Sequence, residues 1–492
     1  MNPELKALHD ELSLLQKEME NSTEKYAALL KNVHPTQIES AKNLLNYLIL
    51  RKTDIQDLQE NLHRHGLSSL ASCESHTHRQ IQVTLERLGE DFSKREAISL
   101  DYGRAKIEET AEELFGKAPE DWPTSVMVTF DKEFLERKEL VSSLLQNGMR
   151  IARINCAHDD SKIWKEMIKL IRNASKKEKI PCKIHLDLAG PKLRTVLLGK
   201  GKNSGRIEVA KGDKIWLSES IEGFSEKDLV INPGEKGVIS DLKVGERVFI
   251  DDGLILTKIL KKEKNSALLV VERNSSKKGR LKAEKGINFP DSKLQIPSLT
   301  EYDLECLEFA VEYADTIGFS FVREAKDLEV LRNELRKYAE DIPPIILKIE
   351  TYESVINFPE LLLEGMKEPS FGVMIARGDL AVEIGFGRLV EIQEEVSWLC
   401  EAAHVSVIWA TQVLENLHKS GLASRAEITD AGRAALAECI MINKGKHTLS
   451  VLKILQEITK RSRSLKMKNR LVFRPLSIAE HFLNRAEKGW KS

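Results

Sequence analysis

The chain has 492 residues, of which 41% are hydrophobic and 31% charged, and its formal net charge is −1. This composition is typical of a globular protein of about three domains. The balanced charge gives no argument for nucleic acid or a membrane surface as partner, and no apolar run approaches the ~20 residues of a membrane span. The charged N-terminus lacks the apolar stretch of a secretory signal, and the six cysteines are scattered without a CxxC pair. We therefore expect a cytoplasmic protein with reduced thiols.

Residues 1–120 are expected to form a helical region, because they contain little glycine or proline and their apolar residues recur at helical spacing. The pattern predicts four helices, at about 3–32, about 36–51, between Asp54 and Gly66, and about 75–88. Histidines at positions 63, 65, 76 and 78 stand two residues apart in pairs. Such pairs do not share a helix face, so we interpret them as solvated polar residues rather than a metal site.

After the helical region, short β-rich runs alternate with helix-length segments. Eight runs read as buried strands: SVMVTF (125–130), RIARIN (150–155), CKIHLDL (182–188), TIGFSF (316–321), IILKIE (345–350), GVMIA (372–376), VSVIWA (405–410) and CIMIN (439–443). Eight strand–helix repeats predict an α/β fold of the (β/α)₈ TIM-barrel type, formed by residues 121–195 and 289–465. Charged and polar side chains, Asp187 among them, collect at the C-terminal ends of these runs, where such barrels carry their chemistry.

The third run is followed by an insertion, residues 196–288, instead of a helix. Its short strand-like runs are separated by glycine and proline turns, which predicts a small β-barrel domain seated as a lid on the active end of the TIM barrel. Residues 466–492 form a basic tail, which we interpret as solvated rather than nucleic-acid-binding.

The segments LKIET (347–351) and MIARGDL (374–380) supply two carboxylates and a lysine at neighbouring strand ends. Lys348 and Glu350 are two residues apart and so point to the same side of a strand, and Asp379 ends the next run. This set suits a magnesium or manganese ion that binds a phosphorylated or enolic substrate; the alternative is a buried ion pair. No GxxxxGK[ST], strand-linked GxGxxG, GxSxG or HExxH motif occurs.

Together, several strings of this chain resemble the pyruvate kinase family, in its order and at roughly its spacing. They are GMRIARINCAH (148–158), LDLAGPKLRT (186–195), FIDDGL (249–254), KGINFPDSKLQIPSLTEYD (285–303), FSFVREAKDL (319–328), LKIETYESV (347–355), MIARGDLAVEIG (374–385) and WATQVLENL (409–417). The resemblance implies a glycolytic enzyme that converts phosphoenolpyruvate and ADP to pyruvate and ATP with Mg²⁺.

The resemblance also implies residue roles. Glu350 and Asp379 match the ligands of the catalytic metal. Lys348 and Arg153 match the cations that face the transferred phosphoryl group, and Thr411 matches a residue that helps to protonate the enolate. The substrate pocket would be lined by Ser320, Arg153, Gly378, Asp379 and Thr411, and the nucleotide would be met by Asn155, His158, Arg194, Lys285 and the lid residue Asp252.

One departure from the family pattern concerns a monovalent cation. The third-strand motif, usually DTKGPE, reads DLAGPK, so that Leu188 replaces the threonine and Lys192 the glutamate; Ala157 replaces a serine that usually contributes an oxygen to a potassium ion. The ammonium of Lys192 can supply the positive charge itself. We therefore predict that Lys192 substitutes for the monovalent cation and that catalysis does not require K⁺.

Other departures leave three readings open. The first-strand motif reads VTFDKEF (128–134) without the usual arginine, and the eighth-strand motif reads MINKGKHT (441–448). Because these changes fall on the nucleotide side, one alternative is an enzyme that uses phosphoenolpyruvate or a related 2-oxo acid with an acceptor other than ADP. The other alternative is a weakly active paralogue that serves as a binding scaffold. We also expect the family's C-terminal domain and its sugar-phosphate site to be absent. The oligomeric state stays open, a homo-oligomer included.

Overall fold

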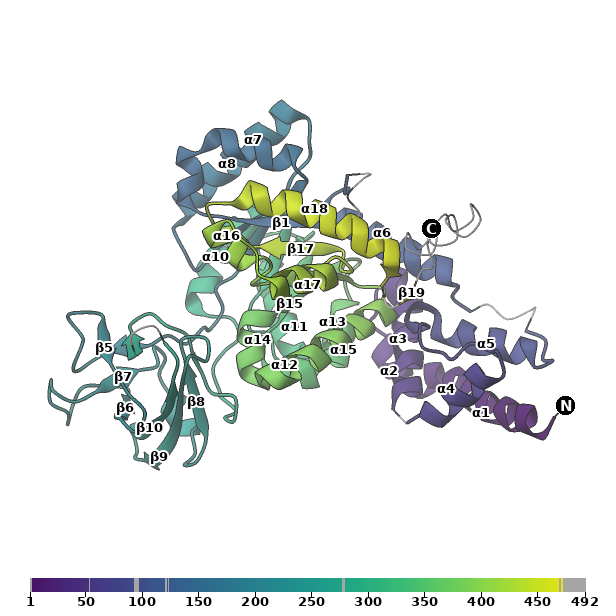
Figure 1. The fold of residues 1–492 in the computed structure, drawn as a ribbon, viewed down its shortest axis with the longest axis horizontal. Helices are drawn as coiled ribbons and strands as arrows, with labels where there is room; N and C mark the ends of the chain where they lie inside the picture. The colour runs from purple at the N-terminus through teal and green to yellow at the C-terminus, as the bar shows by residue number, and fades with distance from the viewer. Residues whose placement is uncertain are drawn as a thin grey trace, which may run out of the picture.

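The computed structural model describes residues 2–52, 54–92, 97–119, 122, 124–276, 279–468 and 470–471. A closed barrel of eight parallel strands stands at the centre of the molecule, with the N-terminal helices on one side and the β-rich insertion on the other (Figure 1). The barrel confirms the predicted (β/α)₈ fold. Of the predicted basic tail, only residues 466–468 and 470–471 are described, and the rest lies outside the described residues.

The barrel strands follow the eight predicted runs closely. They are β1 (Ser125–Phe130), β2 (Met149–Asn155), β3 (Lys183–Asp187), β13 (Thr316–Phe319), β14 (Ile345–Ile349), β15 (Phe371–Ala376), β16 (Ser406–Ala410) and β17 (Cys439–Ile442). The strand order around the barrel is β1-β17-β16-β15-β14-β13-β3-β2. Strands of this kind are covered on both faces, so their sequences are almost continuously apolar; all six residues of β1 are buried.

Helices surround the barrel and connect its strands. They are α7 (Lys138–Gln146), α8 (Ser161–Glu178), α10 (Glu301–Tyr313), α11 (Ala325–Leu335), α12 (Tyr352–Ile356), α13 (Phe358–Gly365), α14 (Arg377–Ile384), α15 (Leu389–Ala402), α16 (Glu415–Ser420), α17 (Arg425–Ala434) and α18 (Thr448–Leu465), with the 3₁₀ turns η3 (Lys132–Glu136) and η5 (Phe386–Arg388). Because all eight strands run in one direction, their C-terminal ends meet at a single rim, where the predicted site residues come together.

The insertion has its own sheets and its own core. Its elements are β4 (Val196–Leu197), β5 (Arg206–Glu208), β6 (Lys214–Ser218), β7 (Val230–Asn232), α9 (Val238–Asp241), β8 (Arg247–Ile250), β9 (Ile255–Lys262), β10 (Ser266–Asn274), β11 (Arg280–Lys282) and β12 (Ile287–Asn288). Seven strands form one sheet in the order β12-β8-β9-β10-β6-β7-β4, and β5 pairs with β11. The alternating burial of β9 and β10 places side chains such as Ile259 and Leu269 in a core separate from that of the barrel.

The N-terminal region is helical, as predicted. Its elements are α1 (Pro3–Lys25), α2 (Ala27–Leu30), η1 (Pro35–Gln37), α3 (Ile38–Arg51), α4 (Gln56–Arg64), η2 (Glu74–His76), α5 (Thr77–Arg87) and α6 (Leu100–Phe115). The predicted first helix is interrupted at Tyr26, whose amide bonds to the carbonyls of Ser22 and Glu24. The interpretation of the histidines as solvated was wrong for His76, which is buried and bonded to Ser75 and Gln80.

This region is fixed to the N-terminal end of the barrel, away from the rim that carries the site. The side-chain amide of Asn43 donates to the carbonyls of Glu74 (2.7 Å) and Ala402 (2.8 Å). At the end of α6, Leu114 and Phe115 pack with barrel-interior residues such as Met127 and Ile346 and close that end of the barrel.

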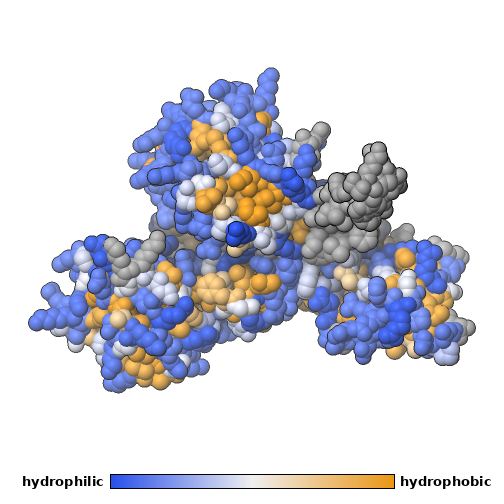
Figure 2. Space-filling view, in the orientation of Figure 1, coloured by the Kyte–Doolittle hydropathy of each residue, from blue (hydrophilic) through white to orange (hydrophobic). Residues whose placement is uncertain are grey.

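The surface in view is mostly hydrophilic and carries a few apolar patches, over both the barrel and the insertion (Figure 2). Within the described residues, no helix combines the length and the apolar character needed to cross a membrane.

Candidate active site

Lys348 is the centre of a buried charge cluster at the barrel rim. It lies near the end of β14, and its ammonium donates to Ser320 Oγ (2.6 Å). Its Nζ also lies 3.3 Å from Asp187 Oδ1 and 3.6 Å from Glu350 Oε1. The predicted alternation along β14 therefore holds, because Lys348 and Glu350 share one side and the buried Ile349 points to the other.

Asp187, at the end of β3, joins Lys348 to Arg153. The guanidinium of Arg153 donates twice to Asp187 Oδ2, through Nε (2.9 Å) and through Nη2, and its Nη1 donates to Thr129 Oγ1 (3.2 Å). Burial alone would raise the pKa of Asp187, but Lys348 and Arg153 outweigh it and hold that pKa well below its ordinary value. The sequence placed Asp187 at a strand end and assigned it no role, whereas the structure makes it the shared counter-ion of both cations.

Glu350 and Asp379 provide the two carboxylates of the predicted metal site. Glu350 Oε1 accepts a hydrogen bond from the amide of Phe321 (2.8 Å), which has a left-handed backbone conformation at φ 56°. Burial raises the pKa of Glu350, Lys348 lowers it, and the neighbouring carboxylate of Asp379 raises it further. Among the described residues, no group of three or more His, Cys, Asp or Glu side chains could hold a metal ion. A pair of carboxylates still fits Mg²⁺, which keeps several waters and takes further oxygens from a phosphorylated substrate.

Lys192 contacts one member of this carboxylate pair, Asp379. Its ammonium contacts both carboxylate oxygens of Asp379, at 2.9 and 2.8 Å. Burial alone would lower the pKa of Lys192, but the carboxylate of Asp379 reverses the effect and raises it, so the side chain stays charged. The site therefore has a cation at the position that the sequence indicated, and its contact is with a predicted metal ligand.

The insertion reaches the same rim through the turn between β8 and β9. Burial raises the pKa of Asp252 in this turn; Lys192 opposes the rise and Asp379 adds to it, which places Asp252 in the field of both groups. Its neighbour Asp251 pairs with Lys285 at 2.8 Å. Two predicted contacts of the nucleotide, Asp252 and Lys285, thus come from the insertion side of the site.

Thr411 and Gly378 lie next to each other at the rim, and Gly378 directly precedes Asp379. A Cβ atom added to Gly378 would lie 3.8 Å from Thr411 Oγ1, and Thr411 has a left-handed conformation (φ 65°). Arg377 holds this turn by donating to the carbonyls of Ala410 (3.0 Å) and Thr411 (2.6 Å). Arg377 was missed as a site residue, although it is part of the MIARGDL string and precedes Gly378 directly.

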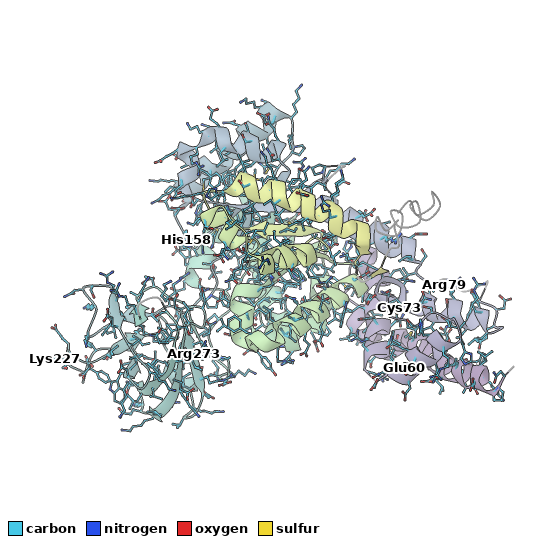
Figure 3. All side chains as sticks on the ribbon, viewed as in Figure 1. Glu60, Cys73, Arg79, His158, Lys227 and Arg273 are labelled. Carbon is cyan, nitrogen blue, oxygen red and sulfur yellow. The ribbon has the colours of Figure 1, made fainter. Side chains whose placement is uncertain are left out.

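The remaining predicted nucleotide contacts lie around the ends of β1, β2 and β17. Figure 3 places His158 at the side of the barrel nearest the insertion. Burial lowers the pKa of His158, and the nearby cations Lys444 and Arg194 lower it further. Lys444, from the altered eighth-strand loop, lies 3.0 Å from Asp131 of the altered first-strand loop. The two loops that depart from the family pattern therefore contact each other.

Asn155 bonds within its own turn, whereas Arg194 bonds to the insertion. Asn155 Oδ1 accepts a hydrogen bond from the amide of Ala157 (3.0 Å), and Arg194 donates to the carbonyl of Glu284 (3.3 Å). Arg194 thus ties the end of the β3 loop to the returning strand of the insertion.

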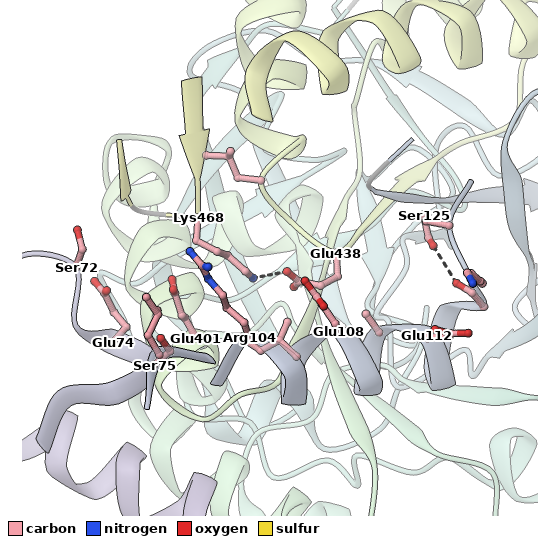
Figure 4. Close-up of a pocket in the computed structure, with 17 residues that line it drawn as sticks. Ser72, Glu74, Ser75, Arg104, Glu108, Glu112, Ser125, Glu401, Glu438 and Lys468 are labelled. Carbon is pink, nitrogen blue, oxygen red and sulfur yellow. Dashed lines mark hydrogen bonds and ion pairs between the residues drawn. The ribbon is translucent and has the colours of Figure 1, made fainter. Parts of the chain in front are cut away.

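Cavities lie near both ends of the barrel. One of about 250 Å³ is at the N-terminal end, lined by α6 and by residues such as Glu74 and Glu438, the latter paired with Lys468 (Figure 4). None of the predicted site residues is among the described residues that line it. A cavity of about 70 Å³ at the other end is lined by Lys192, Asn288 and Glu383 among others, between the insertion and the rim.

Comparison with protein-family models gives a match to "Pyruvate kinase, barrel domain" over residues 124–447. The chain belongs to the pyruvate kinase family. The match contains all eight barrel strands and every predicted site residue, while the helices before residue 116 precede it.

Among individual relatives, a pyruvate kinase of Dictyostelium discoideum is 33% identical over 328 residues, which are 65% of this chain and 61% of the relative. Pyruvate kinases of Staphylococcus aureus strains USA300 and NCTC 8325 are 33% identical over 301 residues, 61% of this chain and 49% of theirs. The chain thus spans about half to three fifths of the length of these curated relatives of the pyruvate kinase family.

Proposed function

We propose that this protein transfers the phosphoryl group of phosphoenolpyruvate to ADP with Mg²⁺ or Mn²⁺, in glycolysis and in the cytoplasm. The observation that carries the proposal is the buried cluster at the barrel rim, in which Lys348 and Arg153 face the carboxylates of Asp187 and Glu350. Phosphoryl transfer is catalysed chiefly by positioning and by stabilisation of charge, and this cluster provides fixed cations for both.

In this proposal, Arg153 and Lys348 bind the phosphoryl oxygens of phosphoenolpyruvate, and Asp187 fixes their positions. Glu350 and Asp379 would hold the divalent ion, which when bound screens the negative charge of the phosphoryl oxygens. The phosphoryl group leaves the enol oxygen and forms a bond to the terminal phosphate oxygen of ADP. The enolate carbon then takes up a proton through water near Thr411, which gives pyruvate.

The nucleotide would be bound by Asn155, His158, Arg194 and Lys285, with Asp252 and the insertion closing over the site and excluding water. Ser320 and Gly378 would line the phosphoenolpyruvate pocket. Lys192 supplies the charge that a monovalent ion supplies elsewhere in the family, so that K⁺ is not required.

The test is a coupled assay of pyruvate formation from phosphoenolpyruvate and ADP with Mg²⁺, run in potassium and in sodium buffers. We expect comparable turnover in both buffers and a loss of at least about 10³-fold in Lys348→Met, because the phosphoryl group loses its central cation. Lys326→Met, which removes an exposed lysine on α11, is the matched control and should keep full activity. Turnover that rises manyfold in potassium would contradict the role of Lys192, and equal activity of both variants would contradict the proposed site.

A second candidate function is phosphoryl transfer from phosphoenolpyruvate to an acceptor other than ADP. The contact between Lys444 and Asp131 favours it, because both loops on the nucleotide side are rebuilt. Isothermal titration with phosphoenolpyruvate and with ADP separates the two. Binding of both ligands supports the kinase, whereas binding of phosphoenolpyruvate alone supports another acceptor.

A further inference from the structure

Lys192 and the proposed metal ion require the same carboxylate. The ammonium of Lys192 lies 2.8 and 2.9 Å from the two oxygens of Asp379, so each carboxylate oxygen already has a cationic partner. The side chain of Lys192 is 27% exposed and that of Asp379 15%, so water screens this ion pair only partly. A divalent ion that uses Asp379 therefore competes with the ammonium for the same two oxygens.

The surroundings offer the displaced ammonium a second place. Asp252, on the turn of the insertion that faces the rim, lies close to Lys192, because a Cβ atom built on Gly286 would be 3.8 Å from Asp252 Oδ1 and 3.9 Å from Lys192 Nζ. The stem of Lys192 lies against the returning strand of the insertion, since a Cβ atom on Gly286 would lie 3.2 Å from Lys192 Cε. Lys192 thus stands between a barrel carboxylate and a carboxylate of the lid.

We propose that Lys192 is an internal counter-ion that occupies the metal ligand Asp379 while the site is empty, and that the divalent ion displaces it toward Asp252 and the substrate phosphate. Metal binding and closure of the insertion are then coupled through one side chain. This inference rests on the proposed function, because it takes Glu350 and Asp379 as the metal ligands.

Two opposite effects follow for a variant that keeps the length of Lys192 and removes its charge. Lys192→Met frees Asp379, so the divalent ion should bind about tenfold more tightly to the substrate-free protein, as expected when a competing, partly buried ion pair is removed. The same variant loses a cation near the substrate phosphate, so phosphoenolpyruvate should bind about tenfold more weakly in the presence of the metal. A merely structural lysine would not change the two affinities in opposite directions.

The experiment measures binding of Mn²⁺ to the full-length protein by the loss of the electron paramagnetic resonance signal of free Mn²⁺. Lys192→Met should bind Mn²⁺ about tenfold more tightly than the natural protein, while Lys192→Arg, which keeps the charge, and Lys293→Met, which removes an exposed lysine beyond the insertion, should not differ from it. Asp252→Asn should weaken Mn²⁺ binding in the natural background and have a smaller effect in Lys192→Met, because the displaced ammonium is then absent.

Unchanged or weaker Mn²⁺ binding by Lys192→Met would overturn the inference while leaving the proposed phosphotransfer intact. Additive effects of the changes at positions 192 and 252 would overturn the coupling to the lid. If neither the natural protein nor Lys192→Met bound Mn²⁺, the inference would fail together with the proposed metal site, and the coupled assay would show whether phosphotransfer fails as well.

Discussion

Replacing Asp187 with asparagine should strongly destabilise the barrel, because Asp187 is the buried counter-ion of two cations. Its side chain is 1% exposed, and it lies 3.3 Å from Lys348 Nζ and 2.9 Å from Arg153 Nε. At these separations, with an effective dielectric constant of about 20, each contact amounts to a gross attraction of about 5 kcal/mol. The cost of removing the charges from water offsets most of this attraction in the natural protein.

That offset disappears when one partner is removed. Asp187→Asn leaves two cations buried without their anion, and such a change typically costs about 3–5 kcal/mol of the free energy of unfolding. For a domain of this size, the midpoint of thermal unfolding should fall by roughly 5–15 °C. Lys348 and Arg153 outweigh the effect of burial, so the pKa of Asp187 in the folded protein lies below the ordinary 3.8. The stability that the Asp187 carboxylate contributes is therefore lost only as the pH falls through that lowered pKa. The loss in the variant should therefore be constant between about pH 5 and pH 8.

The assay is thermal unfolding followed by circular dichroism, with two companion variants. Asp187→Asn combined with Lys348→Met removes one charge of each sign and should recover about half of the loss. Asp291→Asn removes the anion of an exposed pair with Arg247 and should cost no more than about 1 kcal/mol. A single Asp187→Asn variant that unfolds within about 2 °C of the natural protein, or a double variant no more stable than the single one, would refute the assignment of Asp187 as a shared counter-ion.

Two further predictions concern Glu383, which accepts a hydrogen bond from Asn288 at the end of the insertion, and the N-terminal helices. Burial raises the pKa of Glu383 from 4.5 to about 7, so the folded protein loses stability as the pH rises from 4.5 to 7 and the carboxyl group must ionise. Glu383→Gln keeps an acceptor for Asn288 and should be more stable than the natural protein by up to about 3 kcal/mol at pH 8, but equally stable near pH 4.5. Thermal unfolding measures both values, and a stability difference that does not depend on pH would contradict the prediction. Asn43→Ala removes three buried hydrogen bonds, two donated to the carbonyls of Glu74 and Ala402 and one accepted from the amide of Thr77, and should cost about 2–3 kcal/mol. We expect faster hydrogen exchange in α1–α5 with an unchanged barrel. The control is Asn61→Ala, at a partly exposed position, and equal exchange in both variants would argue against docking through Asn43.

The barrel could be predicted because its strands are covered on both faces, which makes their sequences apolar runs of distinctive length, such as SVMVTF and GVMIA. The order of strands in the insertion could not be predicted. There β6 lies between β7 and β10, and this placement depends on pairing between segments that are distant in the chain. The break at Tyr26 was missed because the apolar residues continue past it, and His76 was missed because its burial depends on docking of the region, not on its own helix face.

For the site, spacing along a single strand was informative and contacts across the barrel were not. Lys348 and Glu350 could be placed together from their separation of two residues. Asp187 acquires its role only because β3 and β14 present their ends to the same interior, with β13 between them. Arg377 likewise bonds to carbonyls at the end of β16, a partner that no local pattern specifies.

The charges at the rim give a physical reason for the lysine at position 192. The three cations Arg153, Lys348 and Lys192 face the three carboxylates Asp187, Glu350 and Asp379, so the charges of these six side chains balance. With the glutamate usual in the family at position 192, four carboxylates would face two cations, and a bound monovalent ion would offset part of that excess. A lysine changes the balance by two charges, which is the physical basis of the proposal that no additional ion is required. Because the ammonium is attached to the chain, it contacts Asp379 in the structure, and this contact would connect the proposed independence from K⁺ with the proposed competition for the divalent ion.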